Sequence, residues 1–217
     1  MNVARRMYRQ MKRLRHRWHL WRYGERMRER LRPHAPDYAA YLETQLQRTI
    51  RKNDNRLQPR TVYLVDKLAE LVDLREKEVL CIGCRNHAEL KYIAGKGAKK
   101  VTGIDLFSSH PDILVMDMHQ MTFPDDSFDV VYSSHSLEHA LDPRQVASEI
   151  SRVIRSGGAV LIEVPVSFQP TGADLVNLRD HQGIYNLFTP SSVTPLWQEN
   201  GAENKMMVAR TVFRLSN

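Results

Sequence analysis

Apolar residues gather in short runs between residues 79 and 166, and each run has the length of a buried strand. The runs cover residues 79–82, 100–105, 113–117, 128–132 and 159–166, and polar or helical stretches separate them. A continuous apolar run bounded by turn residues is typical of a strand that is covered on both faces of a sheet. The alternation of strands and helices predicts an α/β fold with a doubly wound, mostly parallel sheet.

Helical periodicity follows the fourth of these runs. Asp142 is a good N-cap and Pro143 a good first helical residue. The apolar residues after them share one face, and they are Val146, Ile150, Val153 and Ile154. Gly157 and Gly158 then turn the chain into the last parallel strand. After Gly201 only a short segment remains, so we expect a tight hairpin or one long strand at the end of the chain.

Two helical segments are predicted ahead of the first strand. One apolar face consists of Tyr38, Tyr41, Leu42, Leu46 and Ile50; the other consists of Val62, Leu64, Val65, Leu68, Leu71 and Val72. We therefore divide the chain into a basic helical extension (residues 1–36), a helical lid or cap (37–75) and a main domain (76–217). The second unit either covers a bound ligand or simply caps the sheet.

Positive charge is concentrated at the start of the chain. Residues 1–32 hold twelve Lys or Arg against Glu25 and Glu29, a balance of +10; since the whole chain carries +7, residues 33–217 carry −3. An apolar stripe runs along the same segment and consists of Met7, Met11, Leu14, Trp18 and Trp21. Three roles fit this segment: packing on the protein or a second subunit, binding an anionic membrane surface, and binding RNA phosphates.

Four short motifs carry the candidate chemistry. Gly83 follows the first strand and Asp105 ends the second, and an acid about 20 residues after a glycine turn is placed to meet ribose hydroxyls in a Rossmann-type unit. Asp117 closes the third strand, and the segment LEH follows the fourth. The segments EVLCIGCRNHAEL, GID, VMDM and LEH, in this order, resemble the class I S-adenosylmethionine-dependent methyltransferases over roughly residues 78–201.

The resemblance implies a Rossmann-like methyltransferase fold and S-adenosyl-L-methionine as the cofactor. It implies that the backbone at Gly83 approaches the methionine moiety, that Asp105 binds the ribose and that Asp117 binds the adenine. His135 would face the sulfonium and the substrate. The expected cofactor-binding residues are Gly83, Cys84, Arg85, Asp105, Leu106, Asp117, Met118, His119, Ser134 and His135.

The glycine turn departs from the family pattern of an acid followed by Gly-x-Gly-x-Gly. Cys81 stands at the place of the acid, and Arg85 and His87 replace the second and third glycines. Glycines there allow close backbone approach to the ligand. Glu89, one helical turn further on, could supply a carboxylate that Cys81 cannot. Three interpretations stay open: a variant cofactor site, a methyltransferase-like domain without activity, and a site for another nucleotide.

Candidate catalytic residues follow from the chemistry of methyl transfer. An in-line displacement is accelerated mainly by orientation of the reactants, and a base is needed only where the acceptor must lose a proton. His135 and His181 are the candidate bases, although each could instead hold a loop. Glu138 and His139 are interpreted as loop-bracing partners, and Glu163 is a carboxylate without an assigned role. We expect no metal site, because the histidines and cysteines show no tight ligand spacing.

The predicted function is S-adenosylmethionine-dependent O-methylation of a small metabolite or of a glycan- or lipid-linked intermediate. The alternatives are an RNA methyltransferase that uses the basic N-terminal segment and a non-catalytic methyltransferase-like scaffold. Cys81 and Cys84 lie too close together for a disulfide framework. No apolar run approaches the roughly 20 residues of a membrane-spanning helix, and the basic start lacks the apolar stretch of a signal peptide. We expect a cytoplasmic protein, with peripheral membrane contact as an option.

Overall fold

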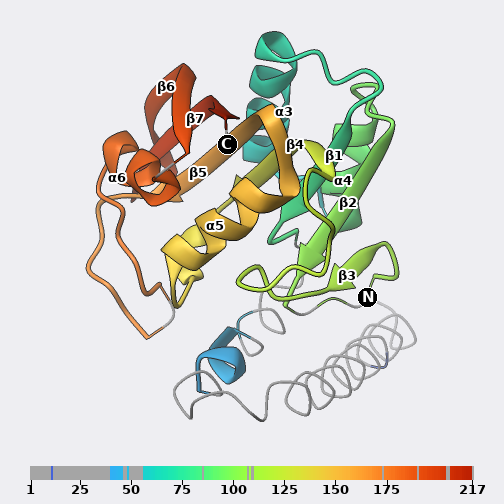
Figure 1. Ribbon diagram of the computed structural model, residues 1–217. Helices are drawn as coiled ribbons and strands as arrows, with labels where there is room; N and C mark the ends of the chain where they lie inside the picture. The colour runs from blue at the N-terminus through green and yellow to red at the C-terminus, as the bar shows by residue number, and fades with distance from the viewer. Residues whose placement is uncertain are drawn as a thin grey trace.

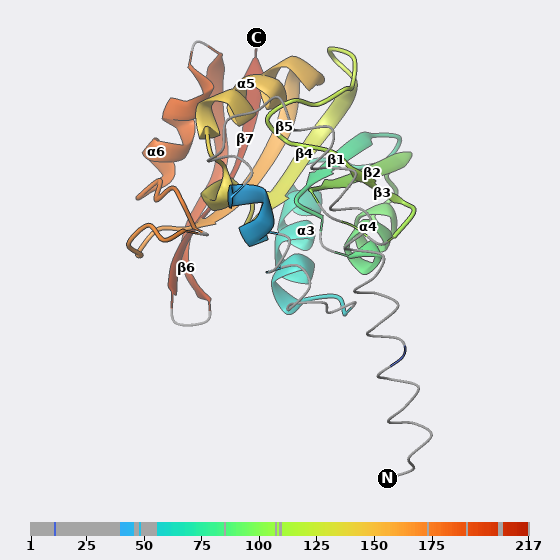
Figure 2. The same ribbon diagram turned by 90° about the horizontal axis from the view of Figure 1, so that it is seen from below.

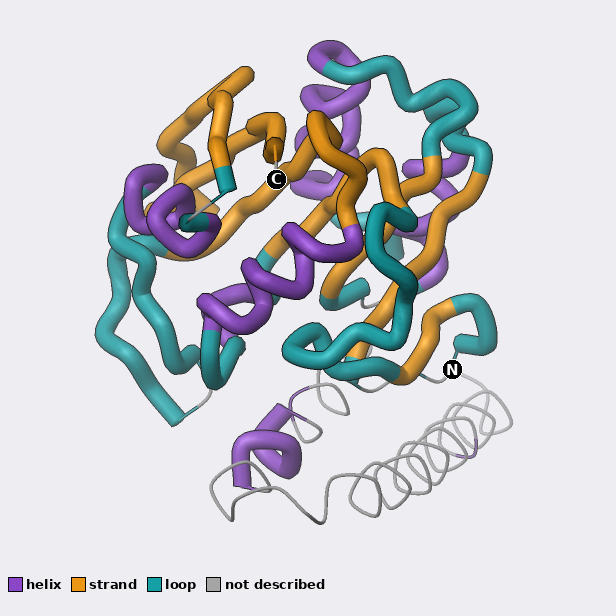
Figure 3. Tube along the Cα trace, in the orientation of Figure 1, coloured by secondary structure: helices purple, strands orange, loops and turns teal. Residues whose placement is uncertain are grey.

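A computed structural model describes nearly all of the chain from residue 56 onward and short parts before it (Figure 1). The described residues are 11, 40–45, 48, 56–84, 86–106, 108, 110–172, 174–189, 191–203 and 206–216. Helices and strands alternate along them (Figure 3). In chain order the elements are α3 (Pro59–Leu71), β1 (Glu78–Ile82), α4 (His87–Ala94), β2 (Lys100–Asp105), β3 (Ile113–Val115), β4 (Phe128–Ser134), η1 (Leu137–His139), α5 (Pro143–Val153), β5 (Ile154–Pro165), α6 (His181–Tyr185), η2 (Asn186–Phe188), β6 (Ser192–Glu203) and β7 (Met206–Ser216).

One sheet of seven strands runs through the described part of the chain. The strand order is β3-β2-β1-β4-β5-β7-β6. The strands β1 to β5 pair in parallel, whereas β7 runs antiparallel to both β5 and β6. The predicted α/β fold with a doubly wound, mostly parallel sheet is therefore confirmed, and its strand order makes it Rossmann-like. Because β1, β2 and β4 are parallel, the loops that follow them meet at one edge of the sheet.

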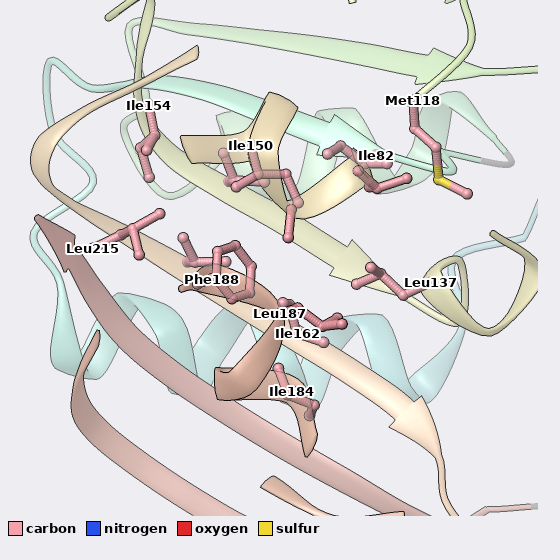
Figure 4. Close-up of a cluster of buried hydrophobic side chains, with 14 of the residues drawn as sticks. Ile82, Met118, Leu137, Ile150, Ile154, Ile162, Ile184, Leu187, Phe188 and Leu215 are labelled. Atoms are coloured by element: carbon pink, nitrogen blue, oxygen red, sulfur yellow. The ribbon is translucent and has the colours of Figure 1, made fainter. Parts of the chain in front are cut away.

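Helices cover both faces of the sheet (Figure 2). The helices α3 and α4 pack on one face, in a cluster that includes Leu64, Leu68 and Ile93. The helices α5 and α6 pack on the other face, in a cluster that includes Ile150 of α5 and Ile184 of α6 (Figure 4). Burial of both faces explains why the central strands read as continuous apolar runs rather than as alternating ones.

The start of α5 follows the sequence prediction. The side chain of Asp142 accepts hydrogen bonds from the backbone N–H groups of Arg144 and Gln145, and Pro143 is the first helical residue. The buried face consists of Val146, Ala147, Ile150 and Val153. Ile154, which we expected on this face, instead begins β5, so the predicted glycine turn at Gly157 lies within the strand as the structure has it.

The carboxyl-terminal hairpin is longer than the sequence suggested. Residues Met206–Ser216 form one long strand, β7, and its partner β6 begins at Ser192 and runs past Gly201 to Glu203. The strand β6 lies at the edge of the sheet, so its side chains alternate between partly buried and exposed positions and give no continuous apolar run. The sequence therefore predicted the inner strand of the hairpin, β7, but not the edge strand, β6.

The segment before α3 is described in part. Residues 40–45 are helical, with Tyr41 and Leu42 buried, and α3 matches the second predicted helix. Met11 is exposed. The other residues of the basic apolar stripe, Met7, Leu14, Trp18 and Trp21, lie outside the described residues. In the described part of the chain, no helix combines the length and the apolar character needed to cross a membrane.

The turn after β1 depends on a glycine. Gly83 has a φ of +70°, and a Cβ built on it would overlap the side chain of Ser136. We expect Gly83→Ala to destabilise the protein by about 2–4 kcal/mol, because a strained backbone and an overpacked contact add together. Gly157 is the matched control, since it has a φ of +79° and nothing within 4 Å of the added Cβ. Urea unfolding of both variants measures the difference; equal losses would show that Ser136 does not restrict this position.

Candidate active site

The loops that follow the parallel strands bring the predicted cofactor residues to one edge of the sheet. Gly83 follows β1, Asp105 ends β2 and Ser134 ends β4. The register pairs Ile82 with both Ile104 and Ser133, so these three strand ends lie side by side. Leu106 continues from Asp105 and is partly exposed at the same edge. The separate sequence motifs therefore form a single candidate site.

Polar contacts close the turn between β1 and α4. The backbone N–H of Cys84 donates to the carbonyl of Ile104 at 3.0 Å. Asn86 caps α4 by accepting from the N–H of Glu89, and its amide donates to the carbonyl of Arg56 at 3.3 Å. Arg85, a predicted cofactor residue, lies outside the described residues. A capping asparagine thus fixes the start of α4 in a turn that lacks two of the glycines found in the family that the sequence resembles.

Glu89 lies beside the two cysteines of this turn. Its carboxylate and the thiols of Cys81 and Cys84 fall within 4.8 Å of one another, and Thr61 of α3 donates a hydrogen bond to it at 3.1 Å. Both cysteines are free and buried. Burial raises the pKa of Cys81; the pKa of Cys84 is also raised, because burial and nearby carboxylates outweigh the lowering contact with Cys81. The side chain of Cys84 faces the core, so a cofactor at this turn would meet only its backbone.

His119 braces the predicted adenine side of the site. Its Nδ1 lies 2.7 Å from Asp117 Oδ1, and its Nε2 accepts from the backbone N–H groups of Leu141 and Asp142 at 3.1 and 3.3 Å. The proton therefore resides on Nδ1, which donates to the carboxylate. Met118 is buried in the core. The ring of His119 serves as a brace that orients Asp117, so any direct contact with a cofactor falls to its neighbours.

Tyr41 connects the segment before α3 to this edge. Its ring meets that of His119 edge-on, with centroids 6.5 Å apart. Burial and the negative charge of Asp105 raise its pKa. The helical residues 40–45 therefore lie beside the predicted ribose and adenine positions, below the sheet in the view of Figure 1.

His135 lies at the centre of a cluster of carboxylates. It follows β4 with a φ of +53°, in the left-handed region. Its Nδ1 lies 3.2 Å from Glu138, and its Nε2 lies 3.4 Å from Glu163 and 3.4 Å from Glu203. These three carboxylates come from η1, β5 and β6, so the cluster joins parts of the chain that are far apart in sequence.

Two arginines hold the outer sides of this cluster. Arg210 of β7 donates to Glu163 at 2.6 Å and to Glu199 at 2.8 Å, and Arg60 of α3 donates to Glu203 at 2.8 Å. Space for Arg210 depends on Gly201, because a Cβ there would lie 2.6 Å from its guanidinium. The completely buried Glu163 also accepts from Ser134 at 2.9 Å.

The carboxylates change the protonation of His135. Burial by itself lowers the pKa of the ring, but the close carboxylates of Glu138, Glu163 and Glu203 outweigh burial and raise the pKa to about 10. The protein as described therefore holds an imidazolium at neutral pH. Because an imidazolium cannot accept a proton, His135 acts as a base only if its proton first leaves the cluster.

His181 belongs to a different environment. It begins α6, and its Nε2 lies 3.1 Å from the backbone carbonyls of both Glu199 and Arg210. Both contacts require a proton on Nε2. His181 thus fastens α6 to the carboxyl-terminal hairpin, whereas the cluster around His135 is built from other side chains.

The residues expected to brace the loop after β4 do so. His139 Nδ1 lies 3.1 Å from Asp174, and Arg48 donates to the same carboxylate at 2.9 Å. The backbone carbonyl of Glu138 accepts from Leu175 and Val176. These contacts tie the loop after β4 to the long loop after β5.

Glu203, Arg210 and Arg60 were missed by the sequence analysis. Each is a charged residue on an element with a partly exposed face, where charge is ordinary. The cross-strand pair Glu163 and Arg210 becomes visible only once β5 and β7 are known to be neighbours. Among the described residues, three groups of ligand-type side chains converge; one of them consists of His135, Glu163 and Glu203, which lie too far apart in the sequence for a spacing argument to detect.

Comparison with known proteins places this geometry in a family. The family described as methyltransferase domain matches residues 51–205. The 27-O-demethylrifamycin SV methyltransferase of Amycolatopsis mediterranei is 31% identical over 123 residues, which cover 49% of this chain and 45% of that protein. The tRNA U34 carboxymethyltransferase of Marinobacter nauticus is 28% identical over 148 residues, which cover 60% and 45%. The matched parts thus span less than half of these relatives.

Solved structures agree on the fold. The 1,6-didemethyltoxoflavin-N1-methyltransferase of Burkholderia thailandensis, solved with S-adenosylhomocysteine, has a TM-score of 0.63 at 17% identity and covers 85% of this chain and 92% of its own. The chain therefore belongs to the methyltransferase-domain family, the class I Rossmann-like S-adenosylmethionine-dependent methyltransferases.

Proposed function

We propose that this protein is an active methyltransferase that uses S-adenosyl-L-methionine. The observation that carries the proposal is the convergence of Gly83, Asp105, Asp117 and His135 on one sheet edge, in the order that the family uses. The alternatives of an inactive domain and of another nucleotide rest on the altered glycine turn alone.

The residues present fit the cofactor. The side chain of Asn86 is occupied by its hydrogen bonds to the start of α4 and to the carbonyl of Arg56, and the side chain of Cys84 is buried in the core. The turn therefore presents backbone to a ligand at the described positions, as a glycine turn would. Asp105 would accept from the ribose hydroxyls, Asp117 would accept from the adenine amine, and Glu89 would supply the carboxylate that Cys81 lacks.

The cofactor supplies an electrophilic methyl group on a sulfonium, and the protein supplies position and electrostatics. Residues 40–45 would act as the lid over the cofactor, since Tyr41 lies against His119 and close to Asp105. The cluster around His135 would form the acceptor side of the pocket. Its carboxylates can accept a hydrogen bond from an acceptor hydroxyl, its cations can donate one to the hydroxyl oxygen, and together they can orient the hydroxyl for in-line attack.

The acceptor we favour is a hydroxyl on a small molecule, including a glycan- or lipid-linked intermediate. The rifamycin relative is an O-methyltransferase by name, which supports this acceptor class. RNA is the second candidate, because residues 1–32 carry a balance of +10 and one relative is named for tRNA. Cytoplasmic location and peripheral membrane contact remain part of the proposal.

Cofactor binding tests the core of this proposal. Calorimetry with S-adenosylmethionine or S-adenosylhomocysteine should show one site per chain, and Asp105→Asn should weaken binding by about 1–3 kcal/mol, since hydrogen bonds to the ribose are lost. Asp112→Asn is a matched control, because that carboxylate is exposed and lies just before β3. Absence of binding at millimolar ligand would refute the methyltransferase proposal.

Substitution of the two histidines separates chemistry from structure. His135→Asn, which tolerates the positive φ, should lower turnover about 10²- to 10⁴-fold and leave cofactor affinity nearly intact, the range expected when proton transfer or hydroxyl orientation is lost. His181→Asn should mainly lower the melting temperature, because it releases α6 from the hairpin. The reverse pattern would make His181 the catalytic residue that the sequence also suggested.

Removal of residues 1–32 tests the second acceptor and the membrane option together. If the arginines contact phosphates, the full chain should bind RNA with an affinity that falls steeply as salt rises, and the shortened chain should not. If the segment lies on membranes, anionic vesicles should recruit only the full chain. A shortened chain that is merely less stable, beside a full chain that ignores both ligands, would assign the segment to packing.

A further inference from the structure

We propose that His135, Glu163 and Glu203 form a binding site for a divalent transition-metal ion of the zinc type. The three ligand atoms are Nε2 of His135 and one carboxylate oxygen from each glutamate, and they lie within 4.8 Å of one another. Imidazole nitrogen and carboxylate oxygen are both ligands that Zn²⁺ accepts. Each of the three ligands lies at the end of a different strand, so the spacing of residues along the sequence does not reveal the site.

The distances suit a single ion. Nε2 of His135 lies 3.4 Å from Glu163 Oε1 and 3.4 Å from Glu203 Oε2. Ligands bound at about 2.1 Å in tetrahedral geometry are separated by about 3.4 Å. The same distance is long for a hydrogen bond. The atoms are therefore spaced as partners of a common ion would be.

Two of these atoms lack a hydrogen-bond partner although they are buried. They are Nε2 of His135 and Oε2 of Glu203. Buried polar atoms without a partner are rare and call for a bound ion or water. Both atoms face the same small volume, because each lies 3.4 Å from the other. A cation between them would satisfy both at once.

The surrounding contacts orient the ligands as in metal proteins. Glu138 holds Nδ1 of His135 at 3.2 Å, which leaves Nε2 for a metal. Arg210 binds the far oxygen of Glu163, and Arg60 binds the far oxygen of Glu203. A carboxylate on the second histidine nitrogen and hydrogen bonds to the ligating carboxylates are the usual outer contacts of such sites.

The charge of the cluster also points to a divalent ion. Among the described residues, four carboxylates share the cluster: Glu138, Glu163, Glu199 and Glu203. They face two guanidinium groups, those of Arg60 and Arg210. With a neutral His135 the cluster keeps two negative charges, which one divalent cation neutralises. A proton on the ring neutralises only one of them.

This metal site would take part in the proposed methyl transfer, and that role rests on the proposed function. Three protein ligands leave a fourth tetrahedral position, which an acceptor hydroxyl oxygen can fill. A metal ion lowers the pKa of such an oxygen. The hydroxyl proton then leaves to solvent, the oxygen forms the bond to the methyl carbon, and the electrons of the broken C–S bond stay on sulfur.

Metal titration of the full chain tests the site without any enzymatic assay. After treatment with a chelator, Zn²⁺ should bind with one ion per chain in calorimetry, and Co²⁺ should give the intense visible absorption of tetrahedral coordination. Glu203→Gln keeps the shape of the side chain but should weaken binding by more than the roughly 10- to 100-fold that loss of an outer contact costs. Glu138→Gln should fall within that range.

Glu199→Gln is the matched control, because Glu199 lies on the same strand and binds the same Arg210 without facing His135. It removes one negative charge from the cluster but no ligand, so it should weaken metal binding far less than Glu203→Gln does. The proposal is overturned if the wild-type chain binds no Zn²⁺ or if Glu203→Gln and Glu199→Gln lose equal metal affinity. It is also overturned if metal binding disappears instead with His87→Ala or Cys84→Ala. Calorimetry with S-adenosylmethionine on metal-free protein reports the proposed function separately, so either idea can fail alone.

Discussion

The buried carboxylate of Glu163 is the contact on which the active-site edge depends. It is completely buried near the end of β5, and it links Ser134 of β4, His135 of the following loop and Arg210 of β7. A buried charge is tolerated only when partners and hydrogen bonds offset its lost hydration, and removal of one partner typically costs about 3–5 kcal/mol. Three separate elements must therefore be in register before this carboxylate is stable. The register of β5 with β7, in which Glu163 faces Arg210, meets that requirement.

The parallel part of the fold was readable from the sequence because its signals are local. Buried strands give continuous apolar runs. Asp142 and Pro143 mark the start of α5, as its N-cap and its first helical residue. Asp105 could be placed at the sheet edge because a glycine turn and an acid keep a fixed spacing in this fold. The edge strand β6 gave no such signal, since half of its side chains face solvent. Ile154 was misplaced for a related reason, because an apolar residue at a helix end fits a helix face and a strand equally well.

The polar centre of the site could not be read from the sequence because it is assembled by pairing of distant strands. Glu163 was noticed as a carboxylate near the correct edge, but Glu203, which shares its contact with His135, and Arg210, which pairs with it, lie 40 and 47 residues further along the chain. Their convergence depends on the long hairpin, whose strand β6 carries Glu203 to the carboxyl ends of β4 and β5. Three carboxylates around one ring raise the pKa of His135 and favour a positive charge at this place.

The divergent glycine turn and the charged cluster lie at the same edge of the sheet, and α3 contacts both. Thr61 of α3 donates to Glu89 beside the turn, while Arg60 binds Glu203 in the cluster. Adjacent residues of one helix thus connect the proposed cofactor side to the proposed acceptor side. A shift of α3 would change both contacts together, because Arg60 and Thr61 are adjacent residues of one helix and the buried Thr61 moves with it. We therefore propose that the helix before the first strand, besides covering the sheet, fixes the distance between the two halves of the site, a distance to which methyl transfer is sensitive.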